Sequence, residues 1–148
     1  MSRYLNLGSG NQVLTGQDGT KYINIDMYPY PEVDIIRDVE KGLPFDDESV
    51  DEIYTSHFLE HINDLNFVME ECYRVLKKGG IMRIIVPHCS TPESIRDPSH
   101  VRFFHEQTFL YFTQPWATDI GHYRTKCNFK IITNVQNSFE LHTKLEKI

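Results

Sequence analysis

His57, Glu60 and His61 stand in the segment SHFLEH, where two imidazoles and a carboxylate recur at a spacing that can bind zinc on a regular helix. A zinc hydrolase that uses His57-x-x-Glu60-His61 is therefore one hypothesis. His57 comes only two residues after a segment that reads as a strand, so we expect a strand-to-helix turn in which the two imidazoles do not share a helix face. We assign no metal site on this pattern. A third ligand remains available from three residues: His88, Cys89 or His100.

Two glycines and an aspartate form a second pattern with chemical meaning. Gly8 and Gly10 follow one short apolar run, and Asp26 ends the next one. A glycine turn after a strand lets the backbone approach a ligand closely, and a carboxylate after the next strand can accept both hydroxyls of a ribose. Val13 stands where a dinucleotide fingerprint has its third glycine, and no helix is predicted after the turn. The pattern therefore favours a nucleoside ligand and disfavours NAD.

The elements that must position these residues follow from hydrophobic patterning. Short apolar runs predict strands at residues 3–7, 22–25, 33–36, 50–55 and 81–86. Apolar residues at helical spacing over 65–76 predict a helix that is capped by Asn63 or Asp64 and followed by Gly79-Gly80. A short helix is expected at 106–112, and alternation on either side of Asn137-Ser138 predicts an antiparallel hairpin. These elements predict a strand-rich α/β fold with a terminal hairpin.

Composition restricts the partners and the compartment. The 148 residues are 40% hydrophobic and carry a formal net charge of −6, which predicts one domain over residues 1–148 and argues against a nucleic-acid partner. Cys72, Cys89 and Cys127 are odd in number and form no C-x-x-C, so we expect reduced thiols. We find no signal peptide and no apolar run long enough to cross a membrane. We therefore expect a cytoplasmic protein without a membrane partner.

Four segments in register carry a family resemblance: LNLGSG, INIDM, LPFDDESVDEIYTSHFLEHI and ECYRVLKKGGIMRIIVP. In this order they resemble the motifs of class I S-adenosylmethionine-dependent methyltransferases, in a small, N-terminally trimmed form similar to methyltransferase type 11. The resemblance covers residues 3 to about 113. It implies a Rossmann-like, doubly wound and mainly parallel sheet whose last strand is antiparallel. It also implies S-adenosylmethionine as the cofactor and transfer of its methyl group to an unidentified acceptor by in-line displacement.

The resemblance implies a role for individual residues. Asp26 would accept the ribose hydroxyls, Asp38 would reach the adenine amino group with the Val39 amide near the ring, and Ser56 and His57 would face the methionine part. The full set of expected cofactor-binding residues is Leu7, Gly8, Ser9, Gly10, Asp26, Met27, Asp38, Val39, Ser56 and His57.

Substrate-side residues are expected in and beside the irregular region. The candidate general bases are His57, His100 and His105, since histidine titrates in the useful range. Arg102 could orient an anionic acceptor. Residues 88–125 are expected to form a lid or substrate region, where aromatic side chains could floor a pocket: Phe103, Phe104, Tyr111, Phe112 and Trp116.

Departures from the family pattern support an alternative function. Asn6 stands where the family usually has an acidic residue, and a loop at 11–20 replaces the usual helix. A non-catalytic, methyltransferase-like module that binds a nucleoside or a partner protein would tolerate both changes. A missing N-terminal helical layer would expose apolar sheet surface and so favour a homodimer. The acceptor itself is not readable from the sequence.

Overall fold

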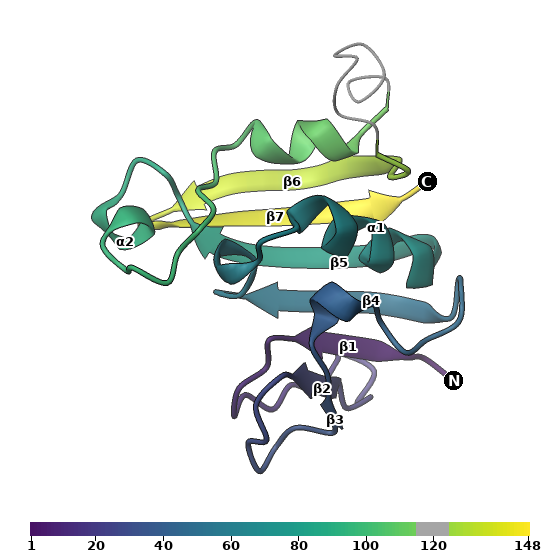
Figure 1. Ribbon diagram of the computed structural model, residues 1–148. Helices are drawn as coiled ribbons and strands as arrows, with labels where there is room; N and C mark the ends of the chain where they lie inside the picture. Colours follow the sequence, from purple (N-terminus) through teal and green to yellow (C-terminus); the bar gives the residue numbers. More distant parts are fainter. Residues whose placement is uncertain (115–124) are drawn as a thin grey trace.

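The computed structural model describes residues 1–114 and 125–148, which form one seven-stranded sheet (Figure 1). The strands lie in the order β3-β2-β1-β4-β5-β7-β6. Their bounds are β1 Tyr4–Leu7, β2 Ile23–Asp26, β3 Ile35–Ile36, β4 Val50–Ser56, β5 Leu76–Pro87, β6 Phe129–Asn137 and β7 Glu140–Lys147. Strands β1 to β5 pair in parallel, whereas β7 is antiparallel to both β5 and β6. The predicted Rossmann-like, doubly wound α/β fold with a terminal hairpin is confirmed.

The strand order determines where a ligand can enter. From β1 the chain runs outward through β2 to β3, then returns to the other side of β1 with β4. In sheets wound in this way, the connections on either side of the reversal leave a crevice at the carboxyl ends of the strands. That edge carries the glycine turn after β1, Asp26 at the end of β2 and Ser56 at the end of β4.

Helix α1 (Leu65–Val75) confirms the helix expected from apolar periodicity. Asp64 caps it, because its Oδ1 atom accepts the backbone N–H of Phe67 at 3.0 Å. Figure 1 shows α1 lying along β5. Its buried stripe consists of Leu65, Val68, Met69, Cys72 and Val75. The shorter helices are η1 (Val39–Lys41), η2 (Leu59–His61), α2 (Pro92–Ile95) and η3 (Thr108–Phe112).

The core lies on one face of the sheet. Leu5, Ile53, Met82 and Leu145 are paired in register across β1, β4, β5 and β7, and each is fully buried. Side chains from adjacent strands therefore form one continuous apolar layer. The buried stripe of α1 belongs to the same core cluster. Within the described residues, no helix is both long enough and apolar enough to cross a membrane.

Strand β3 is shorter than the four residues expected. Only Ile35 and Ile36 pair with β2. Just before them, the Asp34 carboxylate accepts the N–H of Asn24 at 2.8 Å, in place of a ladder carbonyl.

Strand β5 begins earlier than expected. Leu76 follows α1 directly and pairs with Val50, with a register shift before the regular ladder starts. Gly79, at φ +77°, therefore lies in this irregular part of the strand and not at a helix end.

Candidate functional site

The glycine turn joins the ends of β1 and β2. The backbone N–H groups of Gly8 and Ser9 donate to the carbonyl of Ile25 at 2.9 and 3.2 Å. Gly8 has φ +65°, and a Cβ at this position would lie 2.3 Å from Cδ2 of the Phe58 ring. Any side chain would therefore be excluded, both by the backbone conformation and by the ring packed against the turn.

Asp26, the last residue of β2, is held by the loops on either side. Its Oδ2 atom accepts the N–H of Gly10 at 2.9 Å, and its Oδ1 atom accepts the N–H of Tyr28 at 3.0 Å. A carboxylate has about four lone-pair directions, so these two bonds orient the group and still leave acceptor capacity for a ligand hydroxyl. The sequence pattern alone could not show this anchoring.

Asp38 occupies the start of η1. Its Oδ1 atom accepts the N–H of Glu40 at 3.0 Å, and its Oδ2 atom lies 3.7 Å from Nζ of Lys41. Asp38 and Asp26 line the same cavity of about 310 Å³, which is enclosed by the ends of β1 and β2 together with η1 and η2. Two carboxylates on one small cavity suit a ligand rich in hydroxyl, amino or cationic groups.

Half of the expected cofactor residues line this cavity: Gly8, Asp26, Met27, Asp38 and Val39. The others have different surroundings. Leu7 is fully buried and Ser9 nearly so, while Gly10 acts through its hydrogen bond to Asp26. Ser56 and His57 lie at the end of β4, outside the cavity lining.

Other lining residues were not assigned to the site from the sequence: Ile25, Arg37, Glu40, Phe58, His61, Ile62 and Asn63. Arg37 and Glu40 flank Asp38, so their proximity was the available signal. No sequence signal placed the residues of and beside η2 at the cavity, because their position depends on how the turn after β4 folds back. Phe58 lies with its ring against Gly8.

His57 is held between two carboxylates. Its Nε2 atom lies 2.6 Å from Oε1 of Glu140, and its Nδ1 atom lies 3.5 Å from Oε1 of Glu60. Glu60 first, and then Glu140, raise the pKa of His57 to about 9 against the opposing effect of burial. The imidazole is therefore protonated at neutral pH. In that state His57 is a hydrogen-bond donor, and it accepts no proton from an acceptor substrate.

The His57-x-x-Glu60-His61 pattern does not lie on a regular helix. His57 has φ +51°, in the left-handed region, and the following η2 is a three-residue 3-10 turn. The His61 ring is held elsewhere, with its Nδ1 atom 3.3 Å from the carbonyl of Ser99. The two imidazoles thus lack the shared helix face that the zinc-hydrolase hypothesis requires.

The segment around His100 is attached to η2. The backbone N–H groups of Val101 and Arg102 donate to the carbonyl of Glu60 at 2.9 and 3.2 Å. The Arg102 guanidinium donates to the carbonyls of Ile62, at 3.2 Å, and Asn63. These bonds attach Arg102 to the end of η2, and its contact with an anionic acceptor stays a prediction.

His105 lies with His88 and Glu106 and not at the cavity. Its Nε2 atom is 3.2 Å from Oε2 of Glu106, and its side chain is 54% exposed. Of the expected lid, residues 88–114 contain α2 and η3 within otherwise irregular chain. Residues 115–124, with Trp116, lie outside the described residues.

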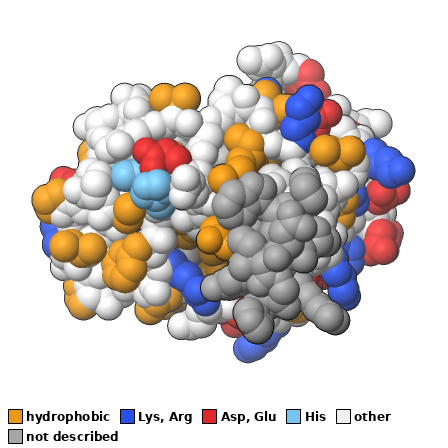
Figure 2. All heavy atoms as spheres, turned by 90° about the horizontal axis from the view of Figure 1, so that it is seen from above, with side chains coloured by type: hydrophobic (Ala, Val, Ile, Leu, Met, Phe, Trp, Pro, Cys, Tyr) orange, Lys and Arg blue, Asp and Glu red, His pale blue; other side chains and the backbone are white. Residues whose placement is uncertain are grey.

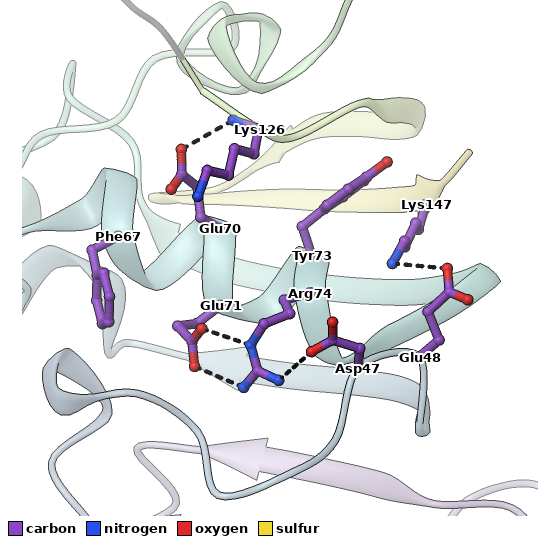
Figure 3. Close-up of a pocket in the computed structure, with 9 residues that line it drawn as sticks. All are labelled: Asp47, Glu48, Phe67, Glu70, Glu71, Tyr73, Arg74, Lys126 and Lys147. Carbon is purple, nitrogen blue, oxygen red and sulfur yellow. Dashed lines mark hydrogen bonds and ion pairs between the residues drawn. The ribbon is translucent and has the colours of Figure 1, made fainter.

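A second hollow, of about 650 Å³, lies beside α1 and near the ends of β6 and β7 (Figure 3). Arg74 pairs with Glu71 and with Asp47, each at 2.7 Å, and Lys147 lies 3.4 Å from Glu48. Because these charges neutralise one another, this larger hollow is a weaker site candidate than the cavity with two carboxylates. On the face in Figure 2, Lys and Arg side chains are likewise interspersed with Asp and Glu.

Comparison with known proteins gives a consistent picture. A family model described as a methyltransferase domain matches residues 5–84. A protein of Mycolicibacterium smegmatis, described as a probable S-adenosylmethionine-dependent methyltransferase, is 36% identical over 77 residues, a match that spans 49% of this chain and only 30% of that relative.

Solved structures match over almost the whole chain. An S-adenosylmethionine-dependent methyltransferase of Archaeoglobus fulgidus has a TM-score of 0.72 at 16% identity, over 99% of this chain and 86% of that one. A complex of the Haloferax volcanii Trm112 methyltransferase activator with a methyltransferase has a TM-score of 0.68 at 16% identity, over 99% of this chain and 82% of that one. At this identity the likeness concerns the fold.

Proposed function

The chain belongs to the S-adenosylmethionine-dependent methyltransferase domain family, and on that premise we propose that it binds S-adenosylmethionine and transfers the methyl group to an acceptor. The observation that carries the proposal is the placement of Asp26 and Asp38 on one cavity beside the Gly8 turn. Asp26 ends β2 and Asp38 follows β3, so both carboxylates lie at the carboxyl edge of the sheet, where sheets of this topology bind ligands.

Each part of the cofactor has a matching group on the chain. Asp26 would accept the ribose hydroxyls, and Asp38 the adenine amino group beside the Val39 amide. The absence of a side chain at Gly8 makes room for the Phe58 ring, and both residues would border the ligand. Ser56 and His57 would border the methionine part from the end of β4.

The bound cofactor supplies a sulfonium-activated methyl group. What the chain must add is alignment of the acceptor and exclusion of water. The cation on His57 would donate a hydrogen bond to an anionic or polar group near the end of β4. Of the expected general bases, His100 lies nearest to the cavity and is the candidate for removing a proton, which is needed only for acceptors that are protonated at neutral pH.

Calorimetric titration of the folded chain with S-adenosylhomocysteine, with NAD as the control ligand, tests the proposal. We expect binding of the first at one site and no binding of the second, because the turn after β1 leads into no helix that could hold a pyrophosphate. Binding of NAD alone would contradict the cofactor assignment.

A second candidate function is a module that works through a partner protein. The likeness to a methyltransferase in complex with an activator supports it, as does the burial of Asn6, which bonds to the Asn24 side chain at 3.1 Å in place of the family's usual acid. For this candidate, the folded chain would bind neither ligand alone. Adding the partner would then restore binding of S-adenosylhomocysteine.

A further inference from the structure

Three side chains converge beside the cavity without a shared role in the fold. Glu60 and His61 come from η2, and His100 comes from the segment bonded to it. One ligand atom from each lies within 4.8 Å of the others. Two imidazoles and one carboxylate form a ligand set used for divalent transition metals.

The Glu60 carboxylate is buried and only half satisfied. Its side chain is 2% exposed, and Oε1 faces Nδ1 of His57 at 3.5 Å. Its Oε2 atom has no hydrogen-bond partner among the described residues. A buried carboxylate oxygen without a partner is costly, and a bound cation would remove that cost. The contact with His57 would orient the carboxylate, as hydrogen-bond partners of metal-binding side chains do.

Both histidines have Nδ1 against a backbone carbonyl, and Nε2 of His100 faces the carboxylates of Asp97 at 3.7 Å and Glu60 at 4.0 Å. Nδ1 of His100 lies 2.8 Å from the carbonyl of Ser94 and must donate to it, so in the neutral ring Nε2 carries a lone pair. Nδ1 of His61 lies 3.3 Å from the carbonyl of Ser99. The Ser99 hydroxyl donates to Asp97 at 2.7 Å, so this hydroxyl can only accept from the His61 ring. Nδ1–H donating to a backbone carbonyl is the usual arrangement of a metal-binding histidine.

A second cluster, formed by His88, His105 and Glu106, also contains two histidines and one carboxylate. In this cluster the imidazole Nδ1 atoms accept hydrogen bonds from the backbone, whereas those of His61 and His100 lie against carbonyls. Nδ1 of His88 accepts the N–H of Ser90 at 3.2 Å, and Nδ1 of His105 accepts the N–H of Gln107 at 3.2 Å. Each ring therefore carries its proton on Nε2. The two Nε2 atoms lie 3.1 and 3.2 Å from Oε2 of Glu106. These contacts, chiefly the one with His88, hold the pKa of the Glu106 carboxyl below its usual value. Both Nε2–H groups thus lie at ion-pair distance from the one carboxylate, although Nε2 of His88 forms no hydrogen bond among the described residues.

We propose that Glu60, His61 and His100 bind one divalent transition-metal ion of the zinc class, and that the cluster at Glu106 does not. Three protein ligands would leave open coordination positions on the ion, as in catalytic zinc sites. Since His61 also lines the cavity with Asp26 and Asp38, the ion would lie at the wall of that cavity. An oxygen ligand of the acceptor could complete its coordination.

Zinc titration of the chelator-treated full chain tests this site. A Cys89→Ser background removes the half-buried thiol as a competing ligand. We expect one Zn²⁺ per chain by calorimetry, a rise in unfolding temperature with zinc, and much weaker binding of Mg²⁺, which prefers oxygen ligands. The measurement needs no methyl donor, so its outcome is independent of the cofactor assignment.

Matched variants decide which histidines bind. His61→Gln and His100→Gln should each weaken zinc binding by at least about tenfold, whereas His105→Gln should leave it unchanged. His61 is exposed, so His61→Gln keeps the test open if His100→Gln destabilises the fold. The proposal is overturned if the folded wild type binds no stoichiometric zinc, if zinc affinity survives in both His61→Gln and His100→Gln, or if His105→Gln weakens it equally.

Discussion

The backbone N–H of Gly10 donates to Oδ2 of Asp26 at 2.9 Å, which ties the turn after β1 to the carboxylate at the end of β2. Gly8 strengthens the same connection through its bond to Ile25. The turn and the carboxylate are therefore one preorganised unit, positioned by two adjacent parallel strands. A ligand that uses both would bind without ordering either of them first.

Gly8→Ala should destabilise the fold more than Gly10→Ala. Both positions have positive φ, which costs an alanine about 1–2 kcal/mol. Only at Gly8 would the new Cβ meet the Phe58 ring, and that overlap adds roughly 1–3 kcal/mol. Denaturant unfolding of both variants measures the difference. Equal losses would show that the ring moves away freely.

Glu71 should contribute to the loss of stability in acid. Its carboxylate accepts from Arg74 at 2.7 and 2.9 Å and from the Leu43 N–H at 2.7 Å, and these bonds hold its pKa below the usual value. A lowered folded pKa means that the stabilisation is present above the unfolded pKa of about 4.3 and is lost as pH falls through the folded pKa.

Glu71→Gln should therefore lower the free energy of unfolding at pH 7 and have a smaller effect at pH 3. Denaturant midpoints of wild type and variant at both values give the comparison. A constant difference between the two proteins at pH 7 and pH 3 would assign the loss to packing.

The three cysteines should differ in reactivity. Burial raises the pKa of the Cys127 thiol to about 12 and that of Cys72 still further, so neither forms thiolate at neutral pH. Cys89 is only half-buried. A thiol reagent should modify one cysteine quickly in the native chain and all three after unfolding, and Cys89→Ser should abolish the fast phase. Fast modification of that variant would contradict the burial of Cys72 and Cys127.

Local patterns were sufficient to predict most of the fold. The apolar runs that stop at Gly8 and at Asp26 located β1 and β2, and the run that begins at Val50 and ends before SHFLEH located β4. The buried stripe of α1 was readable because Val68, Met69 and Cys72 recur at helical spacing. The start of β5 could not be predicted from the sequence, because Leu76 continues the helical periodicity of α1 and only its pairing with Val50 makes it a strand residue.

The candidate site was readable only in part, for a related reason. Asp26 and Asp38 follow strands, and the common edge of a parallel sheet brings such residues together. The contacts of Glu140 with His57 and of His100 with Glu60 join residues far apart in sequence. These contacts form only because the β6–β7 hairpin and the segment bonded to η2 fold against the end of β4, so no local sequence pattern predicts them.

The most direct test of the cofactor assignment is the affinity for S-adenosylhomocysteine of Asp26→Ala beside that of Asp46→Ala, an exposed aspartate outside the cavity lining. Each charge-assisted hydrogen bond lost with Asp26 is worth about 1.5–3 kcal/mol, so we expect at least tenfold weaker binding for Asp26→Ala and wild-type binding for Asp46→Ala. Thermal unfolding confirms that each variant is folded, and Asp26→Asn replaces the alanine variant if it is not. Wild-type affinity in a folded Asp26 variant would contradict the account and place the nucleoside elsewhere.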